Sequence, residues 1–160
     1  MGILNRDLVN KALKLAEPSI LAILNDEGLT WGPKWVVGCT TGNGLPDEGM
    51  LFQFGKDYGK EWNSAEWGNQ EMFFEIAKSK LKLVMREKTA SSVIASTKPW
   101  VLESGEFLYT GGYYQDGIGV AVSGALSRTD EACAKIIHVS ITMLAFLEAE
   151  NRIRENKMEI

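Results

Sequence analysis

The segment Ile118-Gly-Val-Ala-Val-Ser-Gly-Ala-Leu-Ser-Arg-Thr-Asp130 joins a short apolar run to the start of a helical pattern. Residues 118–123 are almost wholly apolar, which is typical of a strand covered on both faces of its sheet. Ser127 and Asp130 have the spacing of a capping box and predict that a helix opens at Ser127. One apolar face of this last helix is formed by Ala132, Ile136, Val139, Met143 and Phe146.

The rest of the chain shows two more helical patterns and three more strand-like runs. Asn5 is a good N-cap for a first helix, which Pro18 is expected to kink or restart. A second helix is expected from residue 69 to about residue 88, and residues 91–100 fit a short helix or a loop. The expected strands are 35–41, 50–55 and 107–110, the last followed by a glycine-rich turn over 111–117.

The order helix, hairpin, helix, hairpin, helix decides the fold class. Strands that arrive in pairs with short turns form an antiparallel sheet, and three main amphipathic helices must cover it. The sequence therefore predicts an α/β protein with an α-β-α layered sandwich. No repeat or linker interrupts residues 1–160, and this length suits a single domain.

Charge and composition exclude several partners. The chain has 17 Lys and Arg against 21 Asp and Glu, a formal net charge of −4, and no local basic stripe. Nucleic acid is therefore not an expected partner. The N-terminus lacks the pattern of a secretory signal, and no apolar run approaches the roughly 20 residues that cross a bilayer. Cys39 and Cys133 are expected to be buried free thiols, which suits the cytoplasm.

Few side chains offer chemistry. The chain has one histidine, His138, so no histidine-based nucleophilic pair is evident, and no Cys-x-x-Cys pair suggests a metal site. Lys78 lies one turn from Phe74 and Leu81, so it reaches a pocket rim or pairs in solvent with Glu75 or Glu71. Trp67 is a candidate wall for a planar ligand, or it closes the core or a subunit contact.

The stretch Val122-Ser-Gly124, followed by Asp130-Glu-Ala-Cys-Ala134, resembles the closing strand and helix of the GlcG/HbpS-like family. That family includes the C-terminal domain of PduO-type proteins. An N-terminal helix, Ala77-Lys-Ser-Lys80 and Gly111-Gly112 agree in order, so the resemblance covers roughly residues 5–147. The family's Gly-Gly-x-Pro is Gly111-Gly112-Tyr113-Tyr114 here, and Ala121 stands where the family usually has glycine before Val-Ser-Gly.

The resemblance implies a profilin-like sandwich that assembles into tetramers or octamers and binds haem, a corrinoid or another small ligand. The implied ligand-binding residues are Lys78, Gly111 and Gly112, to which the aromatic side chains of Tyr113 and Trp67 are added. The first helix has no histidine where haem-binding relatives would carry an iron ligand. The sequence therefore favours a small-molecule binding protein whose ligand is planar or acidic.

Two other functions stay open at this stage. A small-acid isomerase or lyase would use Lys78 to bind charge and Tyr109, Tyr113, Asp116 or Glu71 to move protons. A structural or assembly protein would use its five tryptophans in subunit contacts. A cavity between the helices and the sheet would favour a binding protein or an enzyme, and its absence would favour a structural or assembly protein.

Overall fold

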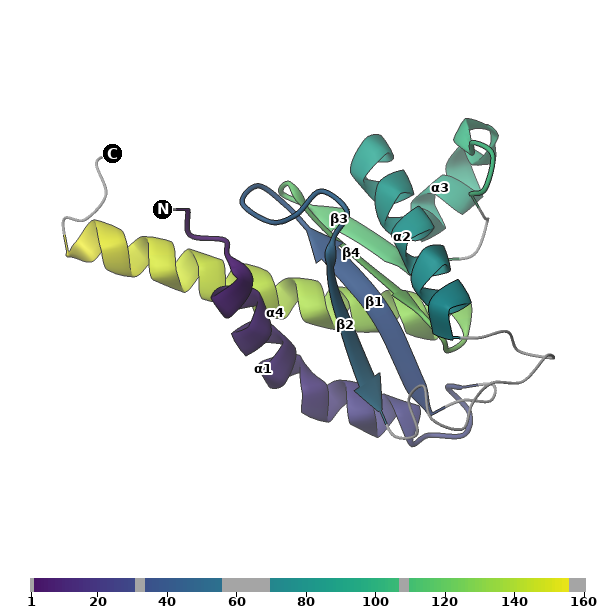
Figure 1. The fold of residues 1–160 in the computed structure, drawn as a ribbon, viewed down its shortest axis with the longest axis horizontal. Coiled ribbons are helices and arrows are strands. Elements are labelled where there is room, and N and C mark those ends of the chain that lie inside the picture. Colours follow the sequence, from purple (N-terminus) through teal and green to yellow (C-terminus); the bar gives the residue numbers. More distant parts are fainter. Residues whose placement is uncertain (1, 31–33, 56–69, 107–109, 156–160) are drawn as a thin grey trace.

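A computed structural model describes residues 2–30, 34–55, 70–106 and 110–155 (Figure 1). Long helices alternate with pairs of strands, as the sequence predicts, and a short helix follows the middle one. The elements are α1 (Arg6–Leu24), β1 (Trp35–Thr41), β2 (Met50–Gly55), α2 (Gln70–Glu87), α3 (Ser91–Thr97), a 3₁₀ turn (Pro99–Val101), β3 (Gly112–Gln115), β4 (Ile118–Ser123) and α4 (Ser127–Arg154).

The four strands form one antiparallel sheet in the order β2-β1-β4-β3. Each hairpin supplies one central and one edge strand, because β1 pairs with β4 across the middle. Every residue of β1 and β4 is buried, whereas β2 alternates buried and exposed residues along most of its length. The continuous apolar run 118–123 thus marks a strand covered on both sides, as predicted.

The helices lie on both faces of the sheet, so the molecule is an α-β-α sandwich (Figure 1). On one face α1 and α4 pack on Val36, Val120 and Val122. On the other face α2 packs on Cys39 and Ala121, with a smaller cluster around Trp35, Val37 and Phe73. Both cysteines are buried free thiols, as expected.

Helix α1 confirms its predicted start and continues through Pro18. The Asn5 side chain accepts a hydrogen bond from the Leu8 amide at 2.9 Å and caps the helix. Pro18 lies inside a helix that continues unbroken to Leu24. Pro18 is exposed while Ala16 and Ile20 on either side are buried, so the α1 packing face holds the helix together across the proline.

The second hairpin differs from its prediction. The strand β3 begins at Gly112, inside the segment expected to be a turn, and the actual turn is Asp116-Gly117. Both turn residues have positive φ, 54° and 81°, as a two-residue type I′ turn requires. Asp-Gly is the strongest short hairpin signal, and it outweighs the glycine pair at 111–112. Of the predicted strand 107–110, residues 107–109 lie outside the described residues.

The side of α4 that packs on the sheet is opposite to the side predicted from the sequence. Its buried residues include Cys133, Ala134, Ile137 and Ile141, whereas Val139, Met143 and Phe146 are 61%, 47% and 60% exposed. The helix has apolar residues on two sides, and spacing alone does not tell which side packs inward. The capping box is also absent, because Leu126 is the N-cap and makes no side-chain cap bond.

Helix α4 is long and apolar enough, by length and composition alone, to cross a membrane. This corrects the expectation that no apolar run comes near that length. The evidence is weak, because core helices of soluble proteins meet the same criterion, and α4 packs against both α1 and β4.

Candidate functional site

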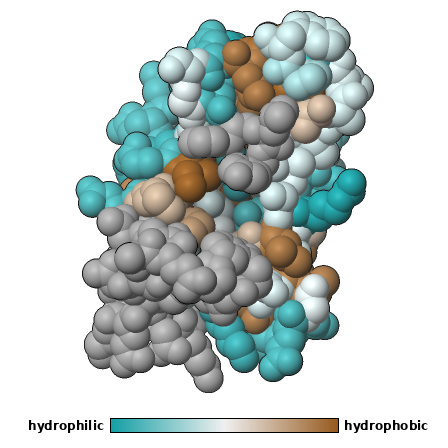
Figure 2. All heavy atoms as spheres, turned by 90° about the vertical axis from the view of Figure 1, so that its right-hand side faces the viewer, coloured by the Kyte–Doolittle hydropathy of each residue, from teal (hydrophilic) through white to brown (hydrophobic). Residues whose placement is uncertain are grey.

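A cavity of about 360 Å³ lies where β4 passes into α4, against the first turns of α2. Its α2 wall is apolar, and its other wall is the strand-to-helix junction. The lining residues are Met72, Phe73, Ile76, Lys80, Ser123, Gly124, Ala125, Leu126, Ser127 and Asp130. Figure 2 looks onto the end of the molecule that carries α2, where hydrophobic patches interrupt a mainly hydrophilic surface. A cavity of this size and character suits a small ligand with an apolar body.

The charged groups of this cavity are Lys80 and Asp130, each only 3–4% exposed. The Lys80 ammonium donates to the carbonyl oxygen of Val122 at 3.0 Å and lies 3.5 Å from Asp130 Oδ2. The Asp130 carboxylate also accepts a hydrogen bond from the Ala125 amide at 2.9 Å. Lys80 of α2 and Asp130 of α4 therefore meet as an ion pair in the lining of the cavity.

Burial opposes the charge on both partners. Loss of solvation raises the pKa of Asp130 to about 7, against the attraction of Lys80 and the hydrogen bonds from Ala125 and Gly124. Loss of solvation likewise lowers the pKa of Lys80, although Asp130 favours its charged form. Burial therefore opposes the charged form of each partner, while each partner favours the charged form of the other.

The glycine pair 111–112 lies beside Lys80. A side chain at Gly111, whose φ is 140°, would meet Val122 O at 2.5 Å and Lys80 Nζ at 2.6 Å. The amides of Gly111 and Gly112 donate to Ser91 Oγ at 3.1 and 2.8 Å. Glycine is needed here both for the positive φ and for the close approach of the lysine.

A second buried carboxylate, that of Glu131, contacts Ser91 and Ser92 at the start of α3. Glu131 is 7% exposed, and its Oε1 accepts a hydrogen bond from the Ser92 amide at 2.9 Å. Ser91 Oγ lies 3.5 Å from the same oxygen. Adjacent residues Asp130 and Glu131 thereby tie the start of α4 to α2 and α3.

The structure places the predicted residue Lys78 on the surface. Its side chain is 39% exposed and its ammonium lies 3.3 Å from Glu75, as the solvated alternative expected. The lysine that meets Gly111 is Lys80, two residues further on. Ligand binding by Lys78 stays a prediction without a geometric partner in the cavity. The middle helix and the glycine pair are in contact through Lys80, but neither Gly111 nor Gly112 lines the cavity, so a shared crevice stays a prediction.

A sequence signal for Lys80 was present. Phe73, Ala77, Lys80 and Val84 follow one another at spacings of four, three and four residues, so Lys80 lies within the apolar stripe of α2. A cation inside such a stripe must be paired or aimed into a cavity.

The predicted aromatic residues do not line this cavity in the part of the chain that the structure describes. Tyr113 lines a different groove, and Trp67 and Tyr109 lie outside the described residues.

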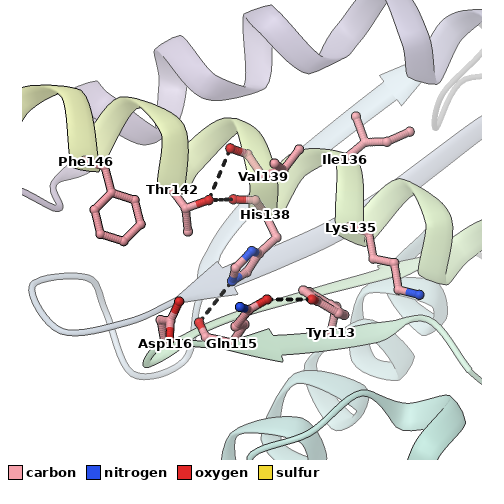
Figure 3. Close-up of a pocket in the computed structure, with 9 residues that line it drawn as sticks. All are labelled: Tyr113, Gln115, Asp116, Lys135, Ile136, His138, Val139, Thr142 and Phe146. Atoms are coloured by element: carbon pink, nitrogen blue, oxygen red, sulfur yellow. Dashed lines mark hydrogen bonds between the residues drawn. The ribbon is translucent and has the colours of Figure 1, made fainter.

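That second groove, of about 480 Å³, lies between β3 and α4 (Figure 3). Its lining residues are Tyr113, Gln115, Asp116, Lys135, Ile136, His138, Val139, Thr142 and Phe146. His138 is 4% exposed, and its Nε2 lies 3.0 Å from Gln115 O. The Tyr113 ring meets the His138 ring edge-on at 5.0 Å. These contacts support a packed histidine that joins the helix to the strand.

The cavity beside Lys80 does not fit a haem iron, because its lining contains no histidine or cysteine to act as an axial ligand. No group of three or more His, Cys, Asp or Glu suited to a metal ion occurs among the described residues. His138 lies in the other groove, with its Nε2 3.0 Å from the Gln115 carbonyl.

Comparison with known proteins identifies no relative. No family model matches the chain. No curated protein and no solved structure matches it either. The resemblance to the GlcG/HbpS-like family and the profilin-like topology stay predictions from the sequence.

Proposed function

We propose that this protein binds a small organic acid with an apolar body in the cavity that contains Lys80 and Asp130. The observation that carries the proposal is a buried ammonium group lining an otherwise mainly apolar cavity. A protein keeps a buried cation when a partner compensates it, and Asp130 does so only partly because its own pKa is near 7. An anionic ligand would complete the compensation.

The start of α4 supports an anion at the same place. The N-cap Leu126 and the first helical residue Ser127 line the cavity, and the N-cap offers no side-chain hydrogen bond to the first turn. The first amides of a helix point outward with a partial positive charge and favour a carboxylate. The apolar side chains Met72, Phe73 and Ile76 would cover the body of the ligand.

Binding should be coupled to a proton. An anion next to the pair favours the state in which Lys80 is charged and Asp130 is protonated. Since the pKa of Asp130 is raised to about 7, that state becomes more populated as the pH falls towards and below neutrality. We expect the affinity for a monocarboxylate to increase as the pH falls from about 8 to about 6.

The test is isothermal titration calorimetry with a panel of small branched and aromatic carboxylic acids, each paired with its uncharged amide. We expect an acid to bind, its amide to bind at least about tenfold more weakly, and Lys78→Met to leave binding unchanged. Lys80→Met should abolish binding. Because loss of a buried charge can also weaken folding, a second variant is needed. Met72→Trp adds bulk at a 42% exposed position of the cavity lining and should weaken binding.

Haem and corrinoid ligands are distinguished by the same series. Hemin titration followed at the Soret band would support a haem function only if the spectral change depends on His138. Failure of every acid to bind, together with a His138-dependent Soret change, would replace the acid proposal by the haem one.

The alternative function is an isomerase or lyase that acts on such an acid. One observation favours it: the Asp130 carboxyl lines the cavity 3.5 Å from the Lys80 ammonium, and burial raises its pKa to about 7, which suits a group that takes up and releases a proton. Incorporation of solvent deuterium at a carbon of a bound acid, lost in Asp130→Asn, would support this function. The cavity itself argues against a purely structural role.

A further inference from the structure

The exposed side of α4 carries a regular apolar stripe that nothing in the described chain covers. We define the α4 seam as Val139, Met143, Phe146, Leu147 and Ile153, which are 43–61% exposed. With Ile136, the spacings along its main row are three, four, three and seven residues, which is the heptad pattern of a helix that packs against another helix.

The seam continues into the groove beside β3. Val139 and Phe146 line that groove together with Tyr113 and Gln115 of the edge strand β3 (Figure 3). Helix α4 also runs on past the sheet towards the C-terminus, so its second half has α1 on one side only (Figure 1). The apolar surface is therefore continuous from the groove along the helix.

We propose that the α4 seam and the groove beside β3 form an interface with a second copy of this chain, related by a two-fold axis, with the two α4 helices antiparallel. Such an interface uses the same patch on both copies, so that patch must be complementary to itself. An apolar stripe on a single helix meets this condition, because each stripe supplies the knobs for the other.

The area is sufficient for a specific dimer. Side chains of this size expose roughly 150–200 Å² each when free, so the five half-exposed seam residues offer roughly 400 Å² of apolar area per copy. Interface cores are about 65% apolar, which gives a total of roughly 1,200 Å² over both copies. That is the lower end of the range for stable protein interfaces.

The experiment is sedimentation equilibrium of the full chain over a wide concentration range. We expect a monomer–dimer equilibrium in the wild type. Phe146→Glu should weaken it at least about 30-fold. The matched control is Leu51→Glu, because Leu51 is 48% exposed on β2, at the opposite edge of the sheet, and should leave the equilibrium unchanged. Thermal melts of the variants as monomers check that each one folds.

A wild type that stays monomeric, or a Phe146→Glu variant that dimerises as well as wild type, would overturn the proposal. Vesicle flotation of a monomeric wild type, lost in Phe146→Glu, would assign the seam to a lipid surface instead.

Discussion

At the scale of single residues, the cavity depends on Lys80, which replaces Lys78 as the lysine that meets the glycine pair. Its ammonium, Asp130 and the Val122 carbonyl form one buried polar group between α2, β4 and α4. Such a group stabilises a fold less than an apolar contact of the same size, but removing one partner is costly. Its place next to a cavity is the basis of the proposed ligand site.

A double-mutant cycle tests this view of the pair. Lys80→Met leaves the Asp130 carboxylate buried without its cation, and we expect a loss of about 3–5 kcal/mol in the free energy of unfolding. The double variant Lys80→Met with Asp130→Asn should lose less free energy of unfolding than the sum of the two single losses, because it leaves no buried charge without a partner. Urea denaturation of the four proteins gives the coupling, and strict additivity would show that the pair does not interact.

The pH dependence of stability follows from the raised pKa of Asp130. In the unfolded chain the carboxyl titrates near its ordinary value of 3.8, and in the folded protein near 7, so the folded state holds an extra proton between these values. Its contribution to stability is therefore complete below about pH 3.8 and is lost as the pH rises through about 7. The melting temperature of wild type relative to Asp130→Asn should fall across this window, and a constant difference would contradict the raised pKa.

The glycine pair gives a third test. Gly111→Ala places a methyl group against Val122 O and Lys80 at a φ of 140°, so it should destabilise the protein by more than the cost of positive φ alone. Gly117→Ala is the matched control, because its φ is 81° but nothing lies within 4 Å of the added carbon. We expect about 1 kcal/mol for Gly117→Ala and at least twice that for Gly111→Ala, measured by denaturant unfolding.

At the scale of elements, α4 has two apolar sides with different roles. The side with Ala134, Ile137 and Ile141 packs on the sheet and α1, and the seam faces outward. The spacing in the sequence pointed to the side with Val139, Met143 and Phe146, which belong to the seam, because that side is the more regular of the two. A helix with an inner and an outer apolar side is expected where a second molecule covers the outer side.

Truncation at neighbouring positions separates the two sides. Ile137→Ala removes a fully buried side chain and should cost about 2–5 kcal/mol in the free energy of unfolding. Val139→Ala, at 61% exposure, should cost well under 1 kcal/mol in the monomer. Thermal and denaturant unfolding at low protein concentration measure both, and equal losses would show that Val139 is buried within one chain.

At the scale of the whole molecule, stability should decrease from the sheet centre outward. Strands β1 and β4 are buried along their whole length and pair with each other. Native-state hydrogen exchange should find their amides exchanging only through global unfolding. Amides of α4 beyond Ile141 should exchange faster in dilute protein and become protected as the concentration rises, if the seam is covered by a second copy. Concentration-independent exchange there would contradict the dimer.

Much of the architecture was readable from the sequence alone. The continuous run 118–123, the N-cap Asn5 and the 69–88 stripe predicted a doubly covered strand, a helix start and a middle helix, and the structure confirms all three. These features are local, because side-chain period, capping and turn chemistry act over a few residues. Two local signals were overlooked: Asp116-Gly117, which sets the hairpin turn and shifts β3 to Gly112, and the place of Lys80 in the apolar stripe of α2.

The tertiary structure alone decided which side of α4 faces the sheet and which groups surround the buried lysine. The α2 stripe already puts Lys80 on the buried face, but only the approach of Gly111 and Asp130, 31 and 50 residues further along the chain, supplies its neighbours. Likewise, two apolar sides of α4 compete for one sheet. Both choices depend on long-range packing, in which the volume and charge of distant segments must match.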